Sequence, residues 1–341
     1  SGNVAVRTAA LTVTEFNNSG GVLDVAGPLT LKAEKLANVT GKIRHSGNEV
    51  LRIDAAQTLN NSSGEIASNS VDLQLSAQTF DNTQGKIVHA GAGTLSFVGQ
   101  TLTNVDGSLE GFGAITLATG SLDNSSGTLL GKTSGTVTVG GALNNRGGTL
   151  ATDGALTVGA ASLDNSAQGQ IVSNDVLAVT TTQALVNSGG TLSAKKGLNA
   201  TAGAQLDNVG GTLVAGTDLS VRAEGALDNT RGTLGAVAGK AQINAVGALT
   251  NLSGRIEAAQ NLTVSSQGLD TRQGTVLGQA LALDTRGQAL DNAGGKIVAD
   301  TSLTIDSGAV TNAAGLIQAG QALTLDTHGQ ALDNRNTQSN P

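Results

Sequence analysis

Carboxylates recur at one fixed position of this 341-residue sequence, immediately before a repeated Asn. Two Asp residues on neighbouring repeats, such as Asp207 with Asp228 or Asp270 with Asp291, are the residue types used for acid–base catalysis or cation binding. A catalytic pair is unique in a chain, whereas these carboxylates recur in half of the repeats. The pattern therefore favours turn chemistry on a solvated corner. The Asp positions are Asp81, Asp123, Asp164, Asp207, Asp228, Asp270, Asp291 and Asp333.

Other candidates for chemistry are isolated. His45 and His89 share a phase of the repeat but lie two repeats apart, roughly 10 Å, which is too far to ligate one metal directly. We expect both to be ordinary surface or edge residues. The segment 147–152, GGTLAT, has Leu where the calcium-binding GGxGxD repeat requires Gly, and 131–135, GKTSG, lacks the rest of a phosphate loop. The sequence therefore predicts no catalytic, cofactor-binding or metal-binding residue.

A sequence motif that recurs sixteen times predicts the elements that would position these residues. The motif is an apolar residue, any residue, Asn, two residues of any type, Gly, one residue of any type, and then Leu, Ile or Val. Examples are LDNVGGTL at 206–213 and LDNAGGKI at 290–297. The period is about 21 residues, which is typical of a stacked array. We expect a buried ladder of side-chain amides, with Thr271 as its one exception: Asn18, Asn38, Asn61, Asn82, Asn104, Asn124, Asn145, Asn165, Asn187, Asn208, Asn229, Asn251, Asn292, Asn312 and Asn334.

Gly follows the Asn position by three residues in fourteen repeats. A Gly at a fixed point suggests a turn whose backbone angle other residues adopt at a cost. The predicted turn glycines are Gly21, Gly41, Gly64, Gly85, Gly107, Gly127, Gly148, Gly190, Gly211, Gly232, Gly254, Gly274, Gly295 and Gly315.

The second half of each repeat alternates apolar, polar and apolar residues, as in Leu156-Thr157-Val158 and Leu303-Thr304-Ile305. This period of two predicts strands with one buried face, and no window has the spacing of a helix. A repeat of 21 residues has room for two or three short strands and tight turns. The sequence therefore predicts an all-β parallel β-helix of about 16 coils: one rod over 1–335, near 75 Å long at roughly 4.8 Å per coil, and a frayed tail at 336–341.

Composition excludes several classes of function. Charged residues are 13% of the chain, the formal net charge is −7, and Lys195-Lys196 is the only adjacent basic pair, which argues against nucleic acid. No apolar run approaches 18 residues and the first residues, SGNVAV, carry no signal peptide pattern. The spacing between repeats varies by only two or three residues, so we expect no long loops, no walled pocket and no enzyme activity. Phe16 and Phe80 occupy the column otherwise held by Leu, and a narrow coil should leave little room for larger rings.

The phrase L-D-N-x-x-G-T-L followed by a G-x-L-T-[LV] strand resembles the haemagglutinin repeats of two-partner-secreted exoproteins. That family includes filamentous haemagglutinins and contact-dependent growth inhibition effectors, and the resemblance spans residues 11–334. It implies a right-handed β-helical filament on, or released from, the surface of a Gram-negative bacterium. It also implies secretion by an outer-membrane transporter that recognises an N-terminal domain, for which this sequence has no counterpart.

We therefore expect the shaft of a secreted adhesin or growth-inhibition stalk, which projects a receptor-binding or toxin element and contributes adhesion to a cell-surface receptor or glycan. Both ends look cut from a longer protein, and the exposed terminal coils should favour end-to-end association. Two alternatives stay open. One is a polysaccharide lyase or glycosidase on the same scaffold. The other is an ice-binding solenoid, suggested by the Thr column at Thr128, Thr149, Thr191, Thr212, Thr233 and Thr275.

Overall fold

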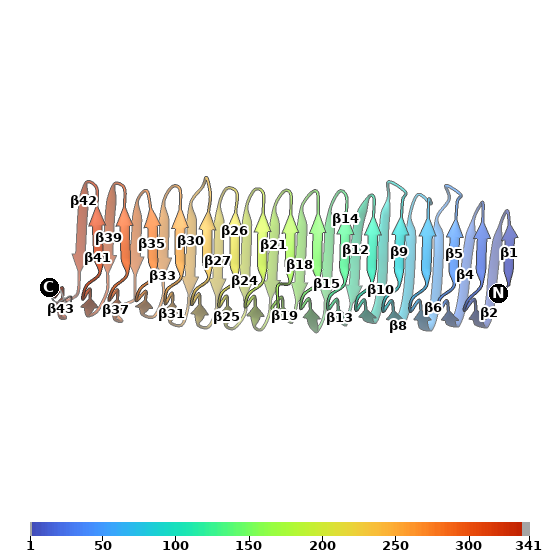
Figure 1. Ribbon diagram of the computed structural model, residues 1–341, viewed down its shortest axis with the longest axis horizontal. Coiled ribbons are helices and arrows are strands. Elements are labelled where there is room, and N and C mark those ends of the chain that lie inside the picture. The colour runs from blue at the N-terminus through green and yellow to red at the C-terminus, as the bar shows by residue number, and fades with distance from the viewer. Residues whose placement is uncertain (1, 336–341) are drawn as a thin grey trace, which may run out of the picture. The chain divides into compact units, whose positions relative to one another are not determined.

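The computed structural model describes residues 2–335, so the tail expected at 336–341 lies outside the described residues. The chain forms two compact units. Unit 1 is Ser1–Asp164 with Gly169–Asn174, and unit 2 is Asn165–Gln168 with Asp175–Pro341. All regular elements of the described residues are strands, and each unit winds them into parallel turns (Figure 1).

The first face of unit 1 consists of four-residue strands, one from each turn, which pair in parallel with the strand of the next turn. These strands follow directly after the Gly of the repeated phrase. They are β1 (Asn3–Val6), β3 (Val22–Val25), β5 (Lys42–His45), β7 (Glu65–Ser68), β9 (Lys86–His89), β11 (Ser108–Gly111), β14 (Thr128–Gly131), β17 (Thr149–Thr152) and β20 (Gln170–Ser173).

The rest of each turn in unit 1 returns to the next Asn. In the first turns the return is one long strand: β2 (Ala9–Asn17), β4 (Leu29–Ala37), β6 (Leu51–Asn60), β8 (Leu73–Asp81) and β10 (Thr94–Thr103). Later turns divide it into a second and a third face: β12 (Ala114–Thr119) and β13 (Ser121–Asp123), β15 (Gly135–Val139) and β16 (Ala142–Asn144), β18 (Leu156–Ala160) and β19 (Ser162–Asp164).

Unit 2 keeps three strands per turn. Its first face is β23 (Thr191–Ala194), β26 (Thr212–Ala215), β29 (Thr233–Ala236), β32 (Arg255–Ala258), β35 (Thr275–Gly278), β38 (Lys296–Ala299) and β41 (Leu316–Ala319). The second face is β21 (Leu177–Thr181), β24 (Leu198–Ala202), β27 (Leu219–Ala223), β30 (Ala241–Ala245), β33 (Leu262–Ser265), β36 (Leu281–Asp284), β39 (Ser302–Asp306) and β42 (Ala322–Asp326). The two-residue strands of the third face are β22 (Leu185–Val186), β25 (Leu206–Asp207), β28 (Leu227–Asp228), β31 (Leu249–Thr250), β34 (Leu269–Asp270), β37 (Leu290–Asp291), β40 (Val310–Thr311) and β43 (Leu332–Asp333).

Like residues stack on like residues within each unit. In unit 2, Leu213 pairs with Leu234, and Val221 pairs with Ile243. These aliphatic residues are at most 1% exposed, while the residues between them face solvent. Each buried Leu or Ile contributes roughly 1.5–3 kcal/mol of transfer free energy. The predicted alternation is thus confirmed, and both units are parallel β-solenoids with one first-face strand per turn, sixteen in all.

Two of the four Phe residues lie in the core, and Phe80 takes the position that Leu59 and Leu102 hold in the neighbouring turns, as predicted. Phe80 and Phe97 are fully buried inside unit 1, with ring centroids 5.3 Å apart. Gly99 provides the space, because a Cβ atom at Gly99 would lie 2.6 Å from Cζ of Phe97. A small residue on the same strand therefore compensates for a larger ring.

Candidate functional site

The repeated Asn side chains of unit 1 form a continuous hydrogen-bonded column, which we call the Asn column. Each Nδ2 donates to Oδ1 of the Asn in the next turn at 2.7 Å, from Asn18 to Asn38 and onward to Asn145. Asn38 to Asn145 are completely buried, and the amide of Asn18 is partly buried. The structure therefore brings all seven Asn residues of this unit together.

Unit 2 has the same column with one interruption. Asn165, Asn187, Asn208 and Asn229 each donate to the next residue at 2.7–2.8 Å, and so do Asn292 and Asn312. Between these runs, Nδ2 of Asn251 donates to Oγ1 of Thr271 at 3.1 Å. Oδ1 of Asn292 is buried and has no hydrogen-bond partner within the described residues.

The Nδ2 atoms also donate to backbone carbonyl groups that point toward the corner. Nδ2 of Asn208 lies 3.2 Å from the carbonyl oxygen of Gly211 in its own turn and 3.3 Å from that of Thr233 in the next turn. A side-chain amide has both a donor and an acceptor group, so it can pass the same interaction from turn to turn. Because buried polar groups are costly when unpaired, the column binds each turn to its neighbours.

The turn glycines lie where the repeat predicts, but the reason given for them was wrong. None of the fourteen has a positive φ angle; the positive angle belongs to the residue before each of them, as at Ser63 (φ 52°) and Arg231 (φ 56°). The Gly is required by close approach. A Cβ atom at Gly232 would lie 2.2 Å from the backbone oxygen of Asn208 and 2.6 Å from Oδ1 of Asn229. Any side chain there would separate two turns.

The Asp residues before the Asn column perform turn chemistry, as predicted. Oδ1 of Asp207 accepts a hydrogen bond from the backbone N–H of Val209 at 2.9 Å, two residues further on, and Asp228 does the same with Thr230 at 2.8 Å. At this corner Arg272 donates to Asp270, and the bond lowers the pKa of that carboxyl. The equivalent bond from Arg335 lowers the pKa of Asp333 to about 2. The carboxylates of Asp270 and Asp333 are thus paired with Arg and ionised.

The two His residues of the first face were wrongly expected at the surface. His45 is 2% exposed and His89 is fully buried, at the corner that follows the first face. His45 Nε2 lies 2.7 Å from the carbonyl oxygen of Gly27, and its Nδ1 lies 3.3 Å from Oγ of Ser68. The signal that could have placed them is local. Each His follows a buried Ile by two residues on its strand, so strand alternation turns it inward.

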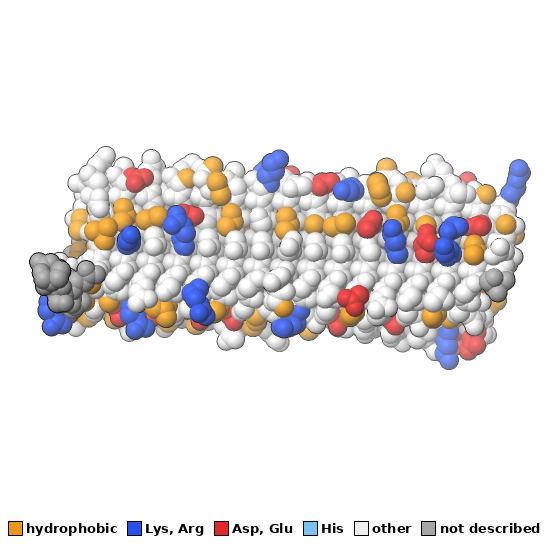
Figure 2. All heavy atoms as spheres, in the orientation of Figure 1, with side chains coloured by type: hydrophobic (Ala, Val, Ile, Leu, Met, Phe, Trp, Pro, Cys, Tyr) orange, Lys and Arg blue, Asp and Glu red, His pale blue; other side chains and the backbone are white. Residues whose placement is uncertain are grey.

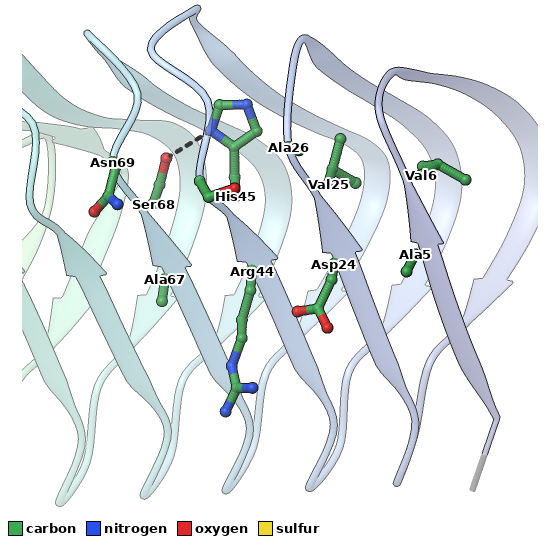
Figure 3. A pocket seen from close by; sticks show the side chains of 11 residues that line it. Ala5, Val6, Asp24, Val25, Ala26, Arg44, His45, Ala67, Ser68 and Asn69 are labelled. Atoms are coloured by element: carbon green, nitrogen blue, oxygen red, sulfur yellow. Dashed lines mark hydrogen bonds between the residues drawn. The ribbon is translucent and has the colours of Figure 1, made fainter.

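A shallow groove of about 420 Å³ runs beside His45 on the outside of unit 1. Figure 3 shows the His45 ring directed toward Ser68, while Arg44 and Asp24 point to another side of their strands. Ser68 is 3% exposed, and its Oγ also lies 2.6 Å from Oγ of Ser70. A buried hydroxyl in this network has no access to a substrate, so the Ser–His contact is structural.

His89 differs from His45 because neither of its ring nitrogens has a hydrogen-bond partner within residues 2–335. Burial lowers the pKa of His89, and the charge of Asp72 acts in the opposite direction. The ring is therefore held neutral in the folded state. Such a group makes the free energy of unfolding depend on pH.

Figure 2 shows Lys and Arg side chains scattered along the visible face among acidic and uncharged residues. In the Thr column, Thr191, Thr212 and Thr233 pair on adjacent turns of unit 2, but Arg255 occupies the equivalent position of the next turn.

Within the described residues 2–335, no group of three or more potential metal ligands occurs. In the same range no helix has the length and apolar character needed to cross a bilayer.

One protein-family model, the haemagglutinin repeat, matches the chain in six segments: residues 1–63, 51–147, 133–189, 187–231, 236–294 and 280–336. No curated protein and no solved structure matches this chain significantly. The six segments together cover nearly every residue and coincide with the turns that carry the Asn column. The chain therefore belongs to the haemagglutinin repeat family.

Proposed function

We propose that this chain is a structural shaft of a secreted, filamentous-haemagglutinin-like protein, which holds a distal binding or toxin element away from the producing cell. The observation that carries the proposal is the Asn column together with the regular spacing of its turns. Between residues 2 and 335 no long loop interrupts the strands to build a walled pocket. Each turn gains its stability from its neighbours. A long, regular scaffold without a cleft suits a mechanical role.

Family membership supports the wider setting. Proteins with haemagglutinin repeats are typically secreted or on the surface of Gram-negative bacteria, in the context of two-partner secretion. We extend this to the present chain: export through an outer-membrane transporter, and display of the shaft at the cell surface. We further propose that residues 1–335 act as one continuous, right-handed rod, the length of which sets the reach of the distal element.

Adhesion by the shaft itself is the finer part of the proposal, and a binding assay separates it from a pure spacer. Purified protein is applied to a glycan array and to host and bacterial cells, beside a variant in which outward-facing polar residues are shuffled among turns. Binding that the shuffled variant loses supports adhesion through a defined face. Equal binding by both proteins, or none by either, leaves the spacer role alone. Turnover of pectin or host glycans by the same preparation would support the enzyme alternative instead.

A further inference from the structure

The interruption of the Asn column at Thr271 leaves a defined set of acceptors in unit 2. In the turn before it, Nδ2 of Asn251 donates toward three oxygens: Gly254 O at 3.3 Å, Thr271 Oγ1 at 3.1 Å and Thr275 O at 3.4 Å. In the turn after it, Nδ2 of Asn292 donates to the equivalent three atoms. The side chain of Thr271 has no amide nitrogen. The three equivalent oxygens at the Thr271 turn therefore receive no hydrogen bond from an amide of residue 271.

The register identifies the three acceptors at the Thr271 turn. Thr275 pairs with Lys296, so the carbonyl oxygen of Lys296 takes the place that Thr275 O has in the preceding turn. The other two acceptors are the carbonyl oxygen of Gly274 and Oδ1 of Asn292. Asn292 is fully buried and its Oδ1 is unpartnered among the described residues. A buried acceptor without a donor destabilises the folded state.

The surroundings of Gly295 lack the amide contact that neighbouring turn glycines have. At Gly274 and Gly315, a Cβ atom would lie 2.9–3.0 Å from Nδ2 of the preceding Asn. At Gly295 no side-chain atom of residue 271 is among the three nearest, and the third neighbour is the oxygen of Gly274 at 3.1 Å. The position that the amide nitrogen takes in the other turns therefore lies beside Gly274 O and Oδ1 of Asn292.

We infer that one ordered water molecule occupies this position and replaces the amide nitrogen that Thr271 lacks. The water donates one hydrogen bond to Oδ1 of Asn292 and one to the carbonyl oxygen of Gly274 or Lys296. Its oxygen accepts a hydrogen bond from the hydroxyl group of Thr271. A buried polar site with two to four partners and room for one probe sphere is where internal water is found. A metal cation would lose its hydration without any carboxylate to replace it, which favours water. This inference does not depend on the proposed function.

A crystal structure of the wild-type protein at a resolution that resolves waters tests the site directly. We expect a peak within hydrogen-bond distance of Oδ1 of Asn292 and of Gly274 O, with no anomalous signal in crystals soaked in rubidium chloride. In Thr271→Asn the peak should be replaced by Nδ2 of the new side chain. Absence of a peak in the wild type, or a peak with rubidium anomalous signal, overturns the inference.

Asn229→Thr provides the matched control, because it makes the same change at a regular position of the same unit. It should leave Oδ1 of Asn251 without its donor and create a second water peak there. In urea, Thr271→Asn should raise the midpoint of unfolding and Asn229→Thr should lower it. A lower midpoint for Thr271→Asn, or an Asn229→Thr structure without the new peak, counts against the inference.

Discussion

At the scale of single residues, Asn and Gly act as a pair, because the Gly without a side chain lets the Asn of the preceding turn approach. The side chain of Asn229 and the backbone of Asn208 both lie within 2.6 Å of the position that a Cβ atom of Gly232 would take. The pairing explains why the two residue types recur at a fixed separation of three. It also makes the contribution of each separately measurable.

Gly232→Ala should destabilise unit 2 by about 3 kcal/mol, because the new methyl group meets backbone oxygen that cannot move without separating two turns. Gly235→Ala in the same turn is the control. A Cβ atom at Gly235 has its nearest neighbour, Cγ2 of Val214, at 3.5 Å, an ordinary contact. The free energy of unfolding from urea titration distinguishes the variants. A similar loss for both would refute the argument from close approach.

Asn208→Ala should cost about 3 kcal/mol, since it removes the donor to Asn229 and the acceptor of Asn187 inside the unit. Asn199→Ala is a suitable control, because Asn199 faces solvent on β24 and takes part in no column. Thermal unfolding followed by circular dichroism should show a lower midpoint for Asn208→Ala alone. An unchanged midpoint would mean that the column contributes little to stability.

Much of the residue-scale arrangement could be predicted from the sequence, because a strict repeat places equal residues in equal environments. The Asn positions, the turn glycines and the Asx turns of residues such as Asp207 all followed from their recurrence. The reason why Gly is required could not be predicted, because a close approach between turns and a positive φ angle both favour Gly in a sequence. Only coordinates separate Gly232 from the strained Arg231 beside it.

At the scale of elements, the strands of the first face end at a corner that differs between the units. In unit 2 this position holds small residues, as at Ala194, Ala215 and Ala236, all nearly buried. In three turns of unit 1 it holds His45, Ser68 and His89, which bring buried polar groups to the same place, whereas Gly111 and Gly131 in later turns of this unit are small. His45 and His89 were misplaced because a polar side chain was assumed to face water, although the alternation of their strands turns both inward.

His89 should make the stability of unit 1 fall in mild acid. Burial holds its pKa below 6.5 in the folded protein, while the unfolded chain titrates near that value, so the unfolded state binds more protons as the pH falls. The stabilisation is present above pH 6.5 and is lost as the pH falls toward the folded pKa. Urea midpoints at pH 5 and pH 8 should differ more in the wild type than in His89→Ser.

His328 in unit 2 gives the opposite sign and serves as the comparison. Its hydrogen bond to Asp306 raises its pKa, so its contribution is present below pH 6.5 and disappears as the pH rises through the folded value. The ring is exposed, and the effect should be small. If His328→Gln and His89→Ser altered the pH profile in the same direction, the assignment of the buried His would be wrong.

At the scale of the whole molecule, the regular repeat of the turns could be predicted from the sequence. That the turns form one continuous rod is a proposal, and it needs a measurement. Each of sixteen first-face strands adds one turn, so a single rod would extend roughly 75 Å at about 4.8 Å per turn. Small-angle X-ray scattering from the monomer should give a maximum dimension near that length and a constant cross-section. Two separate maxima in the pair-distance distribution would show a break in the rod and would weaken the shaft proposal.

The amides of the Asn column all donate in one direction, toward the following turn, in both units. A finished turn therefore presents free N–H donors on its C-terminal side, while the next segment of chain brings the matching oxygens. At its other end the same column presents acceptor oxygens, so a stack can receive a further turn at either end through complementary groups. The column is thus polar along its length, with donors directed to one end and acceptors to the other, so two copies that meet head to tail bring complementary groups together.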